Sequence, residues 1–153
     1  MNIELIVEAK MLSQDKHKND KYGKKPYFEY HIMNVYNRVV EASQKLSETT
    51  RCKLSIVAVL HDVHEDHNVP LKEIAEKFGD DIAEAVNAIS FRKGHESREQ
   101  YYKRVMKNQL ARFVKIQDAL ENAMNCSLEN NWERMSYYTN IVEKLSKVPC
   151  KLV

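Results

Sequence analysis

Two histidines and two aspartates, placed in three separate segments, are residues of this chain that could hold a metal ion. They are His31, the adjacent pair His61 and Asp62, and Asp118. Asp118 falls inside the apolar pattern of a predicted helix, where an unpartnered carboxylate would be costly to bury. One divalent ion could neutralise and bind all four groups together. Such a set leaves coordination positions open for water and a substrate oxygen, which a catalytic metal requires.

A pair of acidic residues follows the second histidine. Residues 54–66 begin as a nearly all-apolar run, typical of a helix buried in a core, and five of the last six residues are polar or ionisable. If this stretch is one helix, Glu65 lies one turn from His61 and Asp66 lies one turn from Asp62. Glu65 and Asp66 could then orient a water molecule or take its proton. The alternative is a buried helix with a charged, solvated end.

Length and composition indicate the fold that must position these residues. The chain has 153 residues, which is enough for one core and too few for two comfortable ones. It contains only three glycines and three prolines, and this scarcity, together with abundant Lys, Glu, Leu and Ala, favours helices. We therefore predict an all-α fold, with a single globular multi-helix domain over residues 1–153.

Apolar periodicity and helix-capping residues divide the chain into seven or eight helices. A loop is expected at residues 14–25 and a break at residues 90–96. Ser97 to Gln100 has the pattern of a capping box, which would begin a helix that leads, after Asn108, into the next. The expected helices cover residues 2–13, 30–46, 50–66, 70–79, 80–89, 97–108, 110–125 and 132–145.

Charge, cysteine content and hydropathy exclude several classes of protein. The formal charge is +2 and no block of like charge suggests a nucleic-acid-binding arm. The three cysteines fit neither a disulfide framework nor a zinc knuckle, and we expect Cys52 and Cys126 to be small core residues. Glu4 stands where a signal peptide would be basic, and the longest apolar run is too short for a membrane span. We expect a cytoplasmic protein without nucleic-acid or membrane partners.

The ordered set of histidines and aspartates resembles the metal-binding pattern of the HD-domain phosphohydrolases. Residues 61–66, His-Asp-Val-His-Glu-Asp, are similar to the His-Asp-x-x-Glu-Asp signature of the RelA/SpoT-type alarmone hydrolases. Residues 114–122, Val-Lys-Ile-Gln-Asp-Ala-Leu-Glu-Asn, resemble the Val-Lys-Leu-Ala-Asp-x-x-x-Asn helix of that group. The resemblance extends from about Ala9 to Leu145 and implies a domain of the HD type.

The resemblance implies a cofactor and a division of roles among the candidate residues. The cofactor would be one divalent transition metal, manganese or alternatively iron, cobalt, nickel or zinc. Glu65 and Asp66 would be the catalytic residues that handle the attacking water, and which of them is the base stays open. The implied metal ligands are His31, His61, Asp62 and Asp118.

The resemblance also implies a set of substrate-binding residues. Lys24 and Lys25 belong to a basic approach to the first histidine, where the family grips phosphates. Arg92 lies in a basic loop, and Asn122 corresponds to the asparagine that contacts the sugar region of the nucleotide. Tyr137 would stack on the base, although simple helix packing explains a tyrosine at that position equally well.

The implied activity is metal-dependent phosphohydrolysis of a nucleotide. Its most specific form is hydrolysis of the 3′-pyrophosphate of guanosine tetra- or pentaphosphate by metal-activated water. Residues 26–31 depart from the family's Pro-Tyr-x-x-His by one extra residue, which shifts the basic loop relative to the metal, and Gln117 replaces a small residue. One alternative is a nucleotidase or phosphodiesterase of the wider HD group. Another is a non-catalytic nucleotide-binding module that retains the metal. The oligomeric state stays open.

Overall fold

The apolar run at residues 54–60 forms the second half of α3 (Glu48–Leu60), a central helix of the domain. In the computed structural model, which describes residues 3–153, every residue of this run is buried. A helix that is apolar around its whole circumference must be covered on all sides. α3 contacts α1 (Ile3–His17), α2 (Met33–Ala42), α6 (Asp80–Ile89) and α8 (Gln109–Leu128). The first two residues of the predicted domain, including the expected helix start at Asn2, lie outside the described residues.

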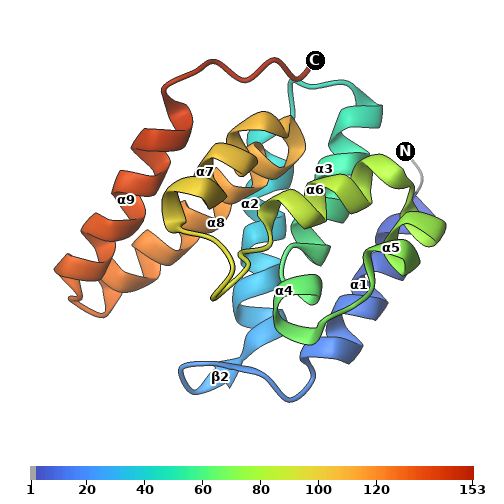
Figure 1. The fold of residues 1–153 in the computed structure, drawn as a ribbon. Coiled ribbons are helices and arrows are strands. Elements are labelled where there is room, and N and C mark those ends of the chain that lie inside the picture. Colours follow the sequence, from blue (N-terminus) through green and yellow to red (C-terminus); the bar gives the residue numbers. More distant parts are fainter. Residues whose placement is uncertain (1–2) are drawn as a thin grey trace.

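The remaining elements surround α3 (Figure 1). α9 runs back along α8 at one side of the domain, and a short antiparallel pair of strands lies below the bundle. The elements are α1 (Ile3–His17), β1 (Lys21–Tyr22), β2 (Lys25–Pro26), a π-helix η1 (Phe28–Ile32), α2 (Met33–Ala42), α4 (Val63–His67), α5 (Leu71–Phe78), α6 (Asp80–Ile89), α7 (Arg98–Lys107), α8 (Gln109–Leu128) and α9 (Trp132–Ser146).

The first helix is longer than its apolar pattern indicates. α1 continues to His17, four residues beyond the predicted end at Ser13. Its buried positions are Ile6, Ala9, Ser13 and His17, which recur every three or four residues and therefore share one face of the helix. The prediction stopped where apolar residues stop, because the last two members of this buried face are polar.

The stretch at residues 54–66 is divided between two helices. α3 ends at Leu60, a turn contains His61 and Asp62, and α4 begins at Val63. The backbone N–H of Asp66 donates to the carbonyl of Asp62 across 2.9 Å, so the chain resumes helical bonding directly after the turn. The turn thus lies between the two helices, and the continuous helix considered from the sequence does not form.

The extra residue at positions 26–31 lies where the chain forms one π-helical turn. In η1 the N–H of Met33 donates to the carbonyl of Phe28, five residues earlier, and α2 follows directly. A π turn holds one residue more than an α turn, so it can accommodate an inserted residue within a helix. Helical structure begins at Phe28 rather than Tyr30 and ends at Ala42 rather than Leu46.

Several local predictions are confirmed. Ser97 and Gln100 form the capping box, with each side chain accepting a hydrogen bond from the backbone of the other residue. Asn108 separates α7 from α8 and caps the second of them by accepting from the N–H of Ala111. Cys52 and Cys126 are both buried. Across the described residues, no helix is both apolar enough and long enough to cross a lipid bilayer.

Candidate metal centre and active site

The four predicted metal ligands come together in the interior of the domain. His31 comes from η1, His61 and Asp62 from the turn after α3, and Asp118 from α8. His31 Nε2 lies 3.3 Å from Asp118 Oδ1 and 3.8 Å from Asp62 Oδ2. His61 Nε2 lies 3.0 Å from Asp62 Oδ2 and 4.0 Å from Asp118 Oδ1. Two imidazole nitrogens therefore face two carboxylates, although the residues are far apart in the chain.

The hydrogen bonding of His61 prepares it to be a metal ligand. Its Nδ1 lies 2.7 Å from the carbonyl oxygen of Ala58, one turn earlier in α3. A carbonyl oxygen only accepts, so Nδ1 carries a hydrogen, and Nε2 is the ring atom that can become a metal ligand once it gives up its proton. The side chain is 1% exposed, and Nε2 lies 3.0 Å from Asp62 Oδ2 without hydrogen-bond geometry. A buried ring nitrogen aimed at two carboxylates fits a bound cation.

The electrostatics of this centre also favour a cation. Burial disfavours the charged form of His61, but the Asp62 and Asp118 carboxylates outweigh it and raise the His61 pKa to about 9. Burial likewise opposes ionisation of Asp118, yet Lys115 and His31 hold the pKa of Asp118 well below its ordinary value. Burial also opposes ionisation of Asp62, but His61 and His31 outweigh it and lower the Asp62 pKa, so both carboxylates are ionised at neutral pH. Without an ion, protonated His61 supplies positive charge beside them, and a bound cation would take over that part.

Three side chains outside the ligand set hold the carboxylates in place. The Tyr27 hydroxyl donates to Asp62 Oδ2 across 2.7 Å, and Lys115 Nζ donates to Asp118 Oδ2 across 2.7 Å. Asn122 Nδ2 donates to Asp118 Oδ1 across 2.8 Å. Contacts of this kind orient ligand groups and tune their affinity for metal. No role was predicted for Tyr27 or Lys115, although both lie within the motifs around His31 and Asp118.

The hairpin contributes a further aromatic wall. The Tyr22 ring stacks on His31 with a centroid separation of 5.2 Å and an interplanar angle of 9°. Its hydroxyl donates to Asn122 Oδ1 across 2.8 Å, so Tyr22 joins the strand pair to α8. Nothing in the sequence marked Tyr22, because its position depends on the fold of the 21–26 hairpin.

Glu65 and Asp66 project from α4 beside the centre. Glu65 Oε2 accepts from the backbone N–H of Phe91 across 2.7 Å, which holds the carboxylate against the loop after α6. Partial burial raises the pKa of Glu65. Partial burial, together with the Asp62 and Glu65 carboxylates, raises the pKa of Asp66 to about 6. A group that titrates near neutral pH, as Asp66 does, suits proton transfer.

A cavity of about 520 Å³ opens over three of the four ligands, His31, Asp62 and Asp118. It combines acidic groups at its base with cationic side chains from α7, α8 and α9 and with tyrosines, a mixture that can hold a phosphorylated molecule. Asn122 and Tyr137 line it, as the resemblance implies, whereas Arg98, Arg134 and Tyr138 were not foreseen. Its lining residues are Tyr22, Tyr27, His31, Asp62, Glu65, Asp66, Arg98, Tyr102, Lys115, Asp118, Asn122, Arg134, Tyr137, Tyr138 and Ile141.

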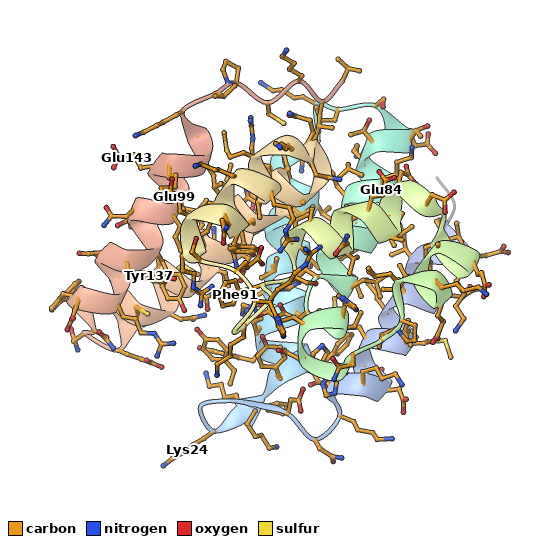
Figure 2. The ribbon with its side chains drawn as sticks, viewed as in Figure 1. Lys24, Glu84, Phe91, Glu99, Tyr137 and Glu143 are labelled. Carbon is orange, nitrogen blue, oxygen red and sulfur yellow. The ribbon has the colours of Figure 1, made fainter. Side chains whose placement is uncertain are left out.

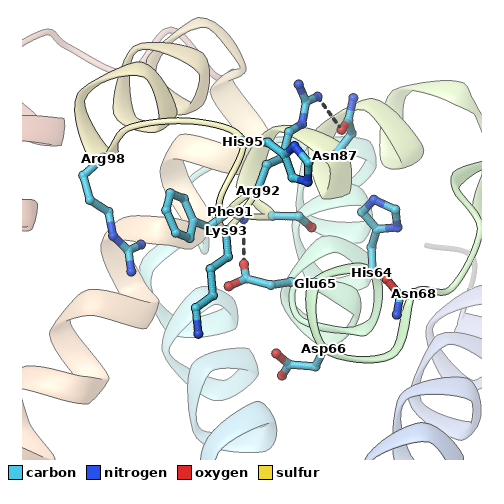
Figure 3. A pocket seen from close by; sticks show the side chains of 11 residues that line it. His64, Glu65, Asp66, Asn68, Asn87, Phe91, Arg92, Lys93, His95 and Arg98 are labelled. Atoms are coloured by element: carbon cyan, nitrogen blue, oxygen red, sulfur yellow. Dashed lines mark hydrogen bonds between the residues drawn. The ribbon is translucent and has the colours of Figure 1, made fainter.

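A second cavity, of about 640 Å³, adjoins the first and shares Glu65, Asp66 and Arg98 with it. Figure 3 shows Lys93 and Arg98 reaching past the Phe91 ring toward the level of the two carboxylates. Arg92 lines this second cavity, where its guanidinium donates to Asn87 Oδ1 across 3.1 Å. The predicted basic loop therefore borders the carboxylate pair from the side away from the metal ligands.

Lys24 and Lys25 lie in the hairpin and line neither cavity. Lys24 follows Gly23 at the tip and projects away from the bundle (Figure 2). Lys25 Nζ lies 3.9 Å from the centroid of the Tyr30 ring, a cation–π contact. The structure thus separates these two predicted phosphate-binding residues from the four metal ligands.

Comparison with known proteins gives a match in structure only. No protein family profile and no curated protein sequence matches the chain. Among solved structures, the domain is similar to one described as a metazoan ortholog of SpoT that hydrolyzes ppGpp and plays a role in starvation responses. The match has a TM-score of 0.75 and covers 94% of this chain and 86% of that chain, with 19% sequence identity.

The chain has that fold. The predicted all-α fold is therefore confirmed, and the structural likeness extends over 94% of the chain. An identity of 19% establishes the arrangement of the helices and not the substrate.

Proposed function

We propose that this protein is a metal-dependent phosphohydrolase that acts on a nucleotide. The observation that carries the proposal is the buried Nε2 of His61, which faces Asp62, with His31 and Asp118 close by. These four residues would hold one divalent transition metal, with manganese as the proposed ion. When bound, such an ion supplies Lewis-acid polarisation of a phosphoryl oxygen and lowers the pKa of water.

The surrounding side chains would perform the remaining tasks. Glu65 and Asp66 lie on the wall shared by both cavities, where they can orient a water molecule and take its proton. Arg98 and Arg134 border the first cavity and would neutralise phosphate charge, since guanidinium groups bind phosphate oxygens in a bidentate manner. Lys115 would hold Asp118 in its ionised form.

The far end of the cavity suits the rest of a nucleotide. Tyr137 and Tyr138 lie there with ring centroids 5.2 Å apart, and an aromatic face can stack on a base. Tyr137 is nearly half exposed, so its ring is available to a ligand. Asn122, which donates to the Asp118 carboxylate, lines the same cavity and would contact the sugar region.

The specific substrate that we propose is guanosine tetra- or pentaphosphate, with hydrolysis of the 3′-pyrophosphate. Two facts support it: the His-Asp-x-x-Glu-Asp pattern of the sequence, and the fold of a protein described as hydrolysing ppGpp. Arg92 and Lys93, on the other side of Glu65, could hold the second phosphate of a pyrophosphate group.

One observation favours a different leaving group. Lys24 and Lys25, which the resemblance assigns to phosphate binding, line neither cavity. A nucleotidase or phosphodiesterase of the same fold needs less positive charge at that side of the ligands. The one-residue insertion within η1 lies between these lysines and His31, so the two departures from the alarmone-hydrolase pattern occur together.

A nucleotide panel separates these activities. The full-length protein, loaded with manganese, would be incubated with alarmones, nucleoside mono-, di- and triphosphates and cyclic dinucleotides, and released phosphate and pyrophosphate would be measured. Pyrophosphate release from the guanosine alarmones alone supports the specific proposal. Release of phosphate from other nucleotides supports the alternative. No release from any nucleotide would contradict both and leave a non-catalytic nucleotide-binding module.

A further inference from the structure

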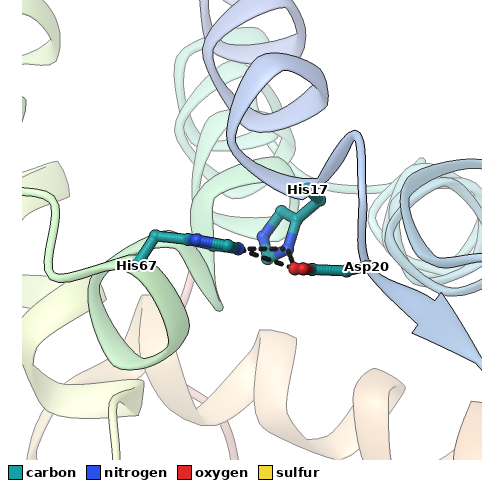
Figure 4. A group of neighbouring side chains, drawn as sticks. All are labelled: His17, Asp20 and His67. Carbon is teal, nitrogen blue, oxygen red and sulfur yellow. Dashed lines mark hydrogen bonds and ion pairs between the residues drawn. The ribbon is translucent and has the colours of Figure 1, made fainter.

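A second group of metal-binding side chains lies apart from the four ligands, where α1 and α4 end side by side. His17 is the last residue of α1, Asp20 lies in the loop after it, and His67 is the last residue of α4. Figure 4 shows the ring nitrogens of both histidines directed at the Asp20 carboxylate. We call these three residues the rim cluster.

The three ligand atoms of the rim cluster are crowded together. Asp20 Oδ2 lies 2.7 Å from His17 Nδ1 and 2.6 Å from His67 Nε2, and the two nitrogens are 3.2 Å apart. As a purely hydrogen-bonded group, both nitrogens would donate to one oxygen, with their two hydrogens side by side. Ligand atoms around one tetrahedral zinc ion lie about 3.3 Å apart, at bond lengths of about 2.0 to 2.1 Å. A small adjustment therefore brings all three atoms to bonding distance from one ion.

The surroundings provide both rigidity and access. The His17 side chain is fully buried, and its ring meets the Tyr27 ring at a centroid distance of 5.1 Å. His67 and Asp20 are 25% and 34% exposed, which leaves a path for an ion from solvent. The two imidazole rings stand nearly perpendicular, at 78°, so their nitrogens approach the carboxylate from different directions.

We propose that His17, Asp20 and His67 bind a second divalent metal ion of the zinc class, independently of the four ligands in the interior. Two imidazoles and one carboxylate form a common donor set for zinc, and water would complete the tetrahedron. The ion would fasten the end of α1 and its loop to the end of α4.

This fastening would act on the neighbouring site through α4. His67 directly follows Asp66, so an ion at the rim cluster fixes the end of the helix that carries Glu65 and Asp66. Tyr27 provides a second connection, because its ring packs on His17 while its hydroxyl donates to Asp62. The ion would be a positioning element for the carboxylate pair, without contact to substrate.

The test measures zinc bound to full-length Asp118→Ala protein, in which the interior centre is disabled. The apoprotein would be titrated with Zn²⁺ alone against a chromophoric chelator. We expect one equivalent to bind. Adding His67→Gln or Asp20→Asn should weaken zinc binding by roughly 10- to 100-fold or more, because loss of an outer contact alone has an effect of that size. His95→Gln, which removes an exposed imidazole from the loop after α6, is the matched control and should change nothing.

Thermal unfolding provides a second readout that also checks folding. At a zinc concentration 100 times Kd, the Tm of Asp118→Ala should rise by about 5 to 10 °C. The same protein with His67→Gln should fold, by circular dichroism, and show no such rise. Zinc binding that is absent from Asp118→Ala, or that survives both His67→Gln and Asp20→Asn, would overturn the inference and leave a hydrogen-bonded triad.

The outcome is distinguishable from failure of the proposed function. If the wild-type protein binds two equivalents and each single variant loses a different one, both proposals stand. If the wild type binds one equivalent that His67→Gln removes and Asp118→Ala does not, the rim cluster stands and the interior centre fails.

Discussion

The interior centre and the rim cluster use the same chemical groups in different surroundings. In the interior, the three residues His31, His61 and Asp118 are at most 4% exposed and come from positions far apart in the chain. There, separate contacts from Ala58, Lys115 and Asn122 fix the ligand atoms. In the rim cluster the three side chains contact mainly one another and two of them reach solvent.

The two sites differ in how far they are preorganised for an ion. Outer contacts hold the interior ligands apart at 3.0 to 4.0 Å, so space for an ion is preorganised and little must move on binding. The rim-cluster atoms have closed on one another at 2.6 to 3.2 Å and must open to admit an ion. We therefore expect tighter binding and slower exchange in the interior.

The largest expected effect comes from removing the Asp118 carboxylate. Asp118→Ala should abolish metal binding in the interior centre and reduce nucleotide hydrolysis by about 10³-fold or more, since an ion's charge stabilisation amounts to several kcal/mol. Zinc at the rim cluster should remain. Metal analysis and steady-state kinetics check both statements, and full metal occupancy of the interior centre in this variant would show that the ligand set is wrong.

Replacing both acidic residues of α4 should separate metal binding from chemistry. Glu65→Gln combined with Asp66→Asn should lower kcat by about 10²- to 10⁴-fold, the usual contribution of proton transfer. Neither residue belongs to the interior centre or to the rim cluster, so both metal sites should keep their ions. The rate of phosphate or pyrophosphate release and the metal stoichiometry would be measured on the same sample. Unchanged kcat would refute the role given to this pair.

A smaller change tests the tyrosine that touches both clusters. Tyr27→Phe removes the hydroxyl bound to Asp62 and keeps the ring that packs on His17. Metal affinity in the interior should fall by roughly 10- to 100-fold while the rim cluster is unchanged. Tyr30→Phe is the matched control, because the Tyr30 hydroxyl donates to Asn125 and to neither cluster. Equal weakening at both clusters in Tyr27→Phe would mean that the ring position, not the hydrogen bond, matters.

The smallest effect should come from the loop that carries Arg92, which contacts neither cluster. Arg104 donates to Glu96 and to the carbonyls of Asn87, Ala88 and Ser90, closing this loop against α6. Burial opposes ionisation of Glu96, but Arg104 outweighs it and lowers the Glu96 pKa. Glu96→Gln should therefore destabilise the fold by about 1 kcal/mol at neutral pH, as loss of a charged hydrogen bond does.

The pH dependence of that loss follows from the direction of the shift. Because the Glu96 pKa is lower in the folded protein, its contribution is present above its ordinary pKa near 4.5 and is lost as the pH falls through the folded value. Urea unfolding of both proteins at pH 7 and pH 3.5 should show the difference shrinking in acid. A constant difference would mean that the Glu96 charge is not responsible.

The sequence was sufficient for the interior centre and insufficient for its surroundings. His31, His61, Asp62 and Asp118 match in type and order the metal-ligand pattern of the family that the sequence resembles, so their convergence could be expected before any helix was placed. Tyr22, Arg134 and Tyr138 have no motif, and they reach the cavity only through the hairpin and through α9 packing against α8. Tertiary packing of this kind leaves no local sequence signal.

The rim cluster illustrates a different reason for failure. His17 was assigned to a loop because apolar residues stop at Ser13, and the buried face of α1 continues through polar side chains. His67, 50 residues later, meets it only because the chain turns after α3. Periodicity detects apolar faces, and it misses a buried face whose members are polar and hydrogen-bonded to each other.

The π turn of η1 has a consequence for how the two halves of its helix are aligned. Successive α-helical residues advance by about 100° around the axis, so one inserted residue would rotate everything before it by that angle relative to α2. Accommodation in a π turn avoids this rotation. Ile32, Val35 and Val39 can remain in phase with the core while Tyr27, on the other side of the insertion, still faces Asp62. The turn thus acts as an angular spacer, and the insertion becomes compatible with an unchanged orientation on both sides.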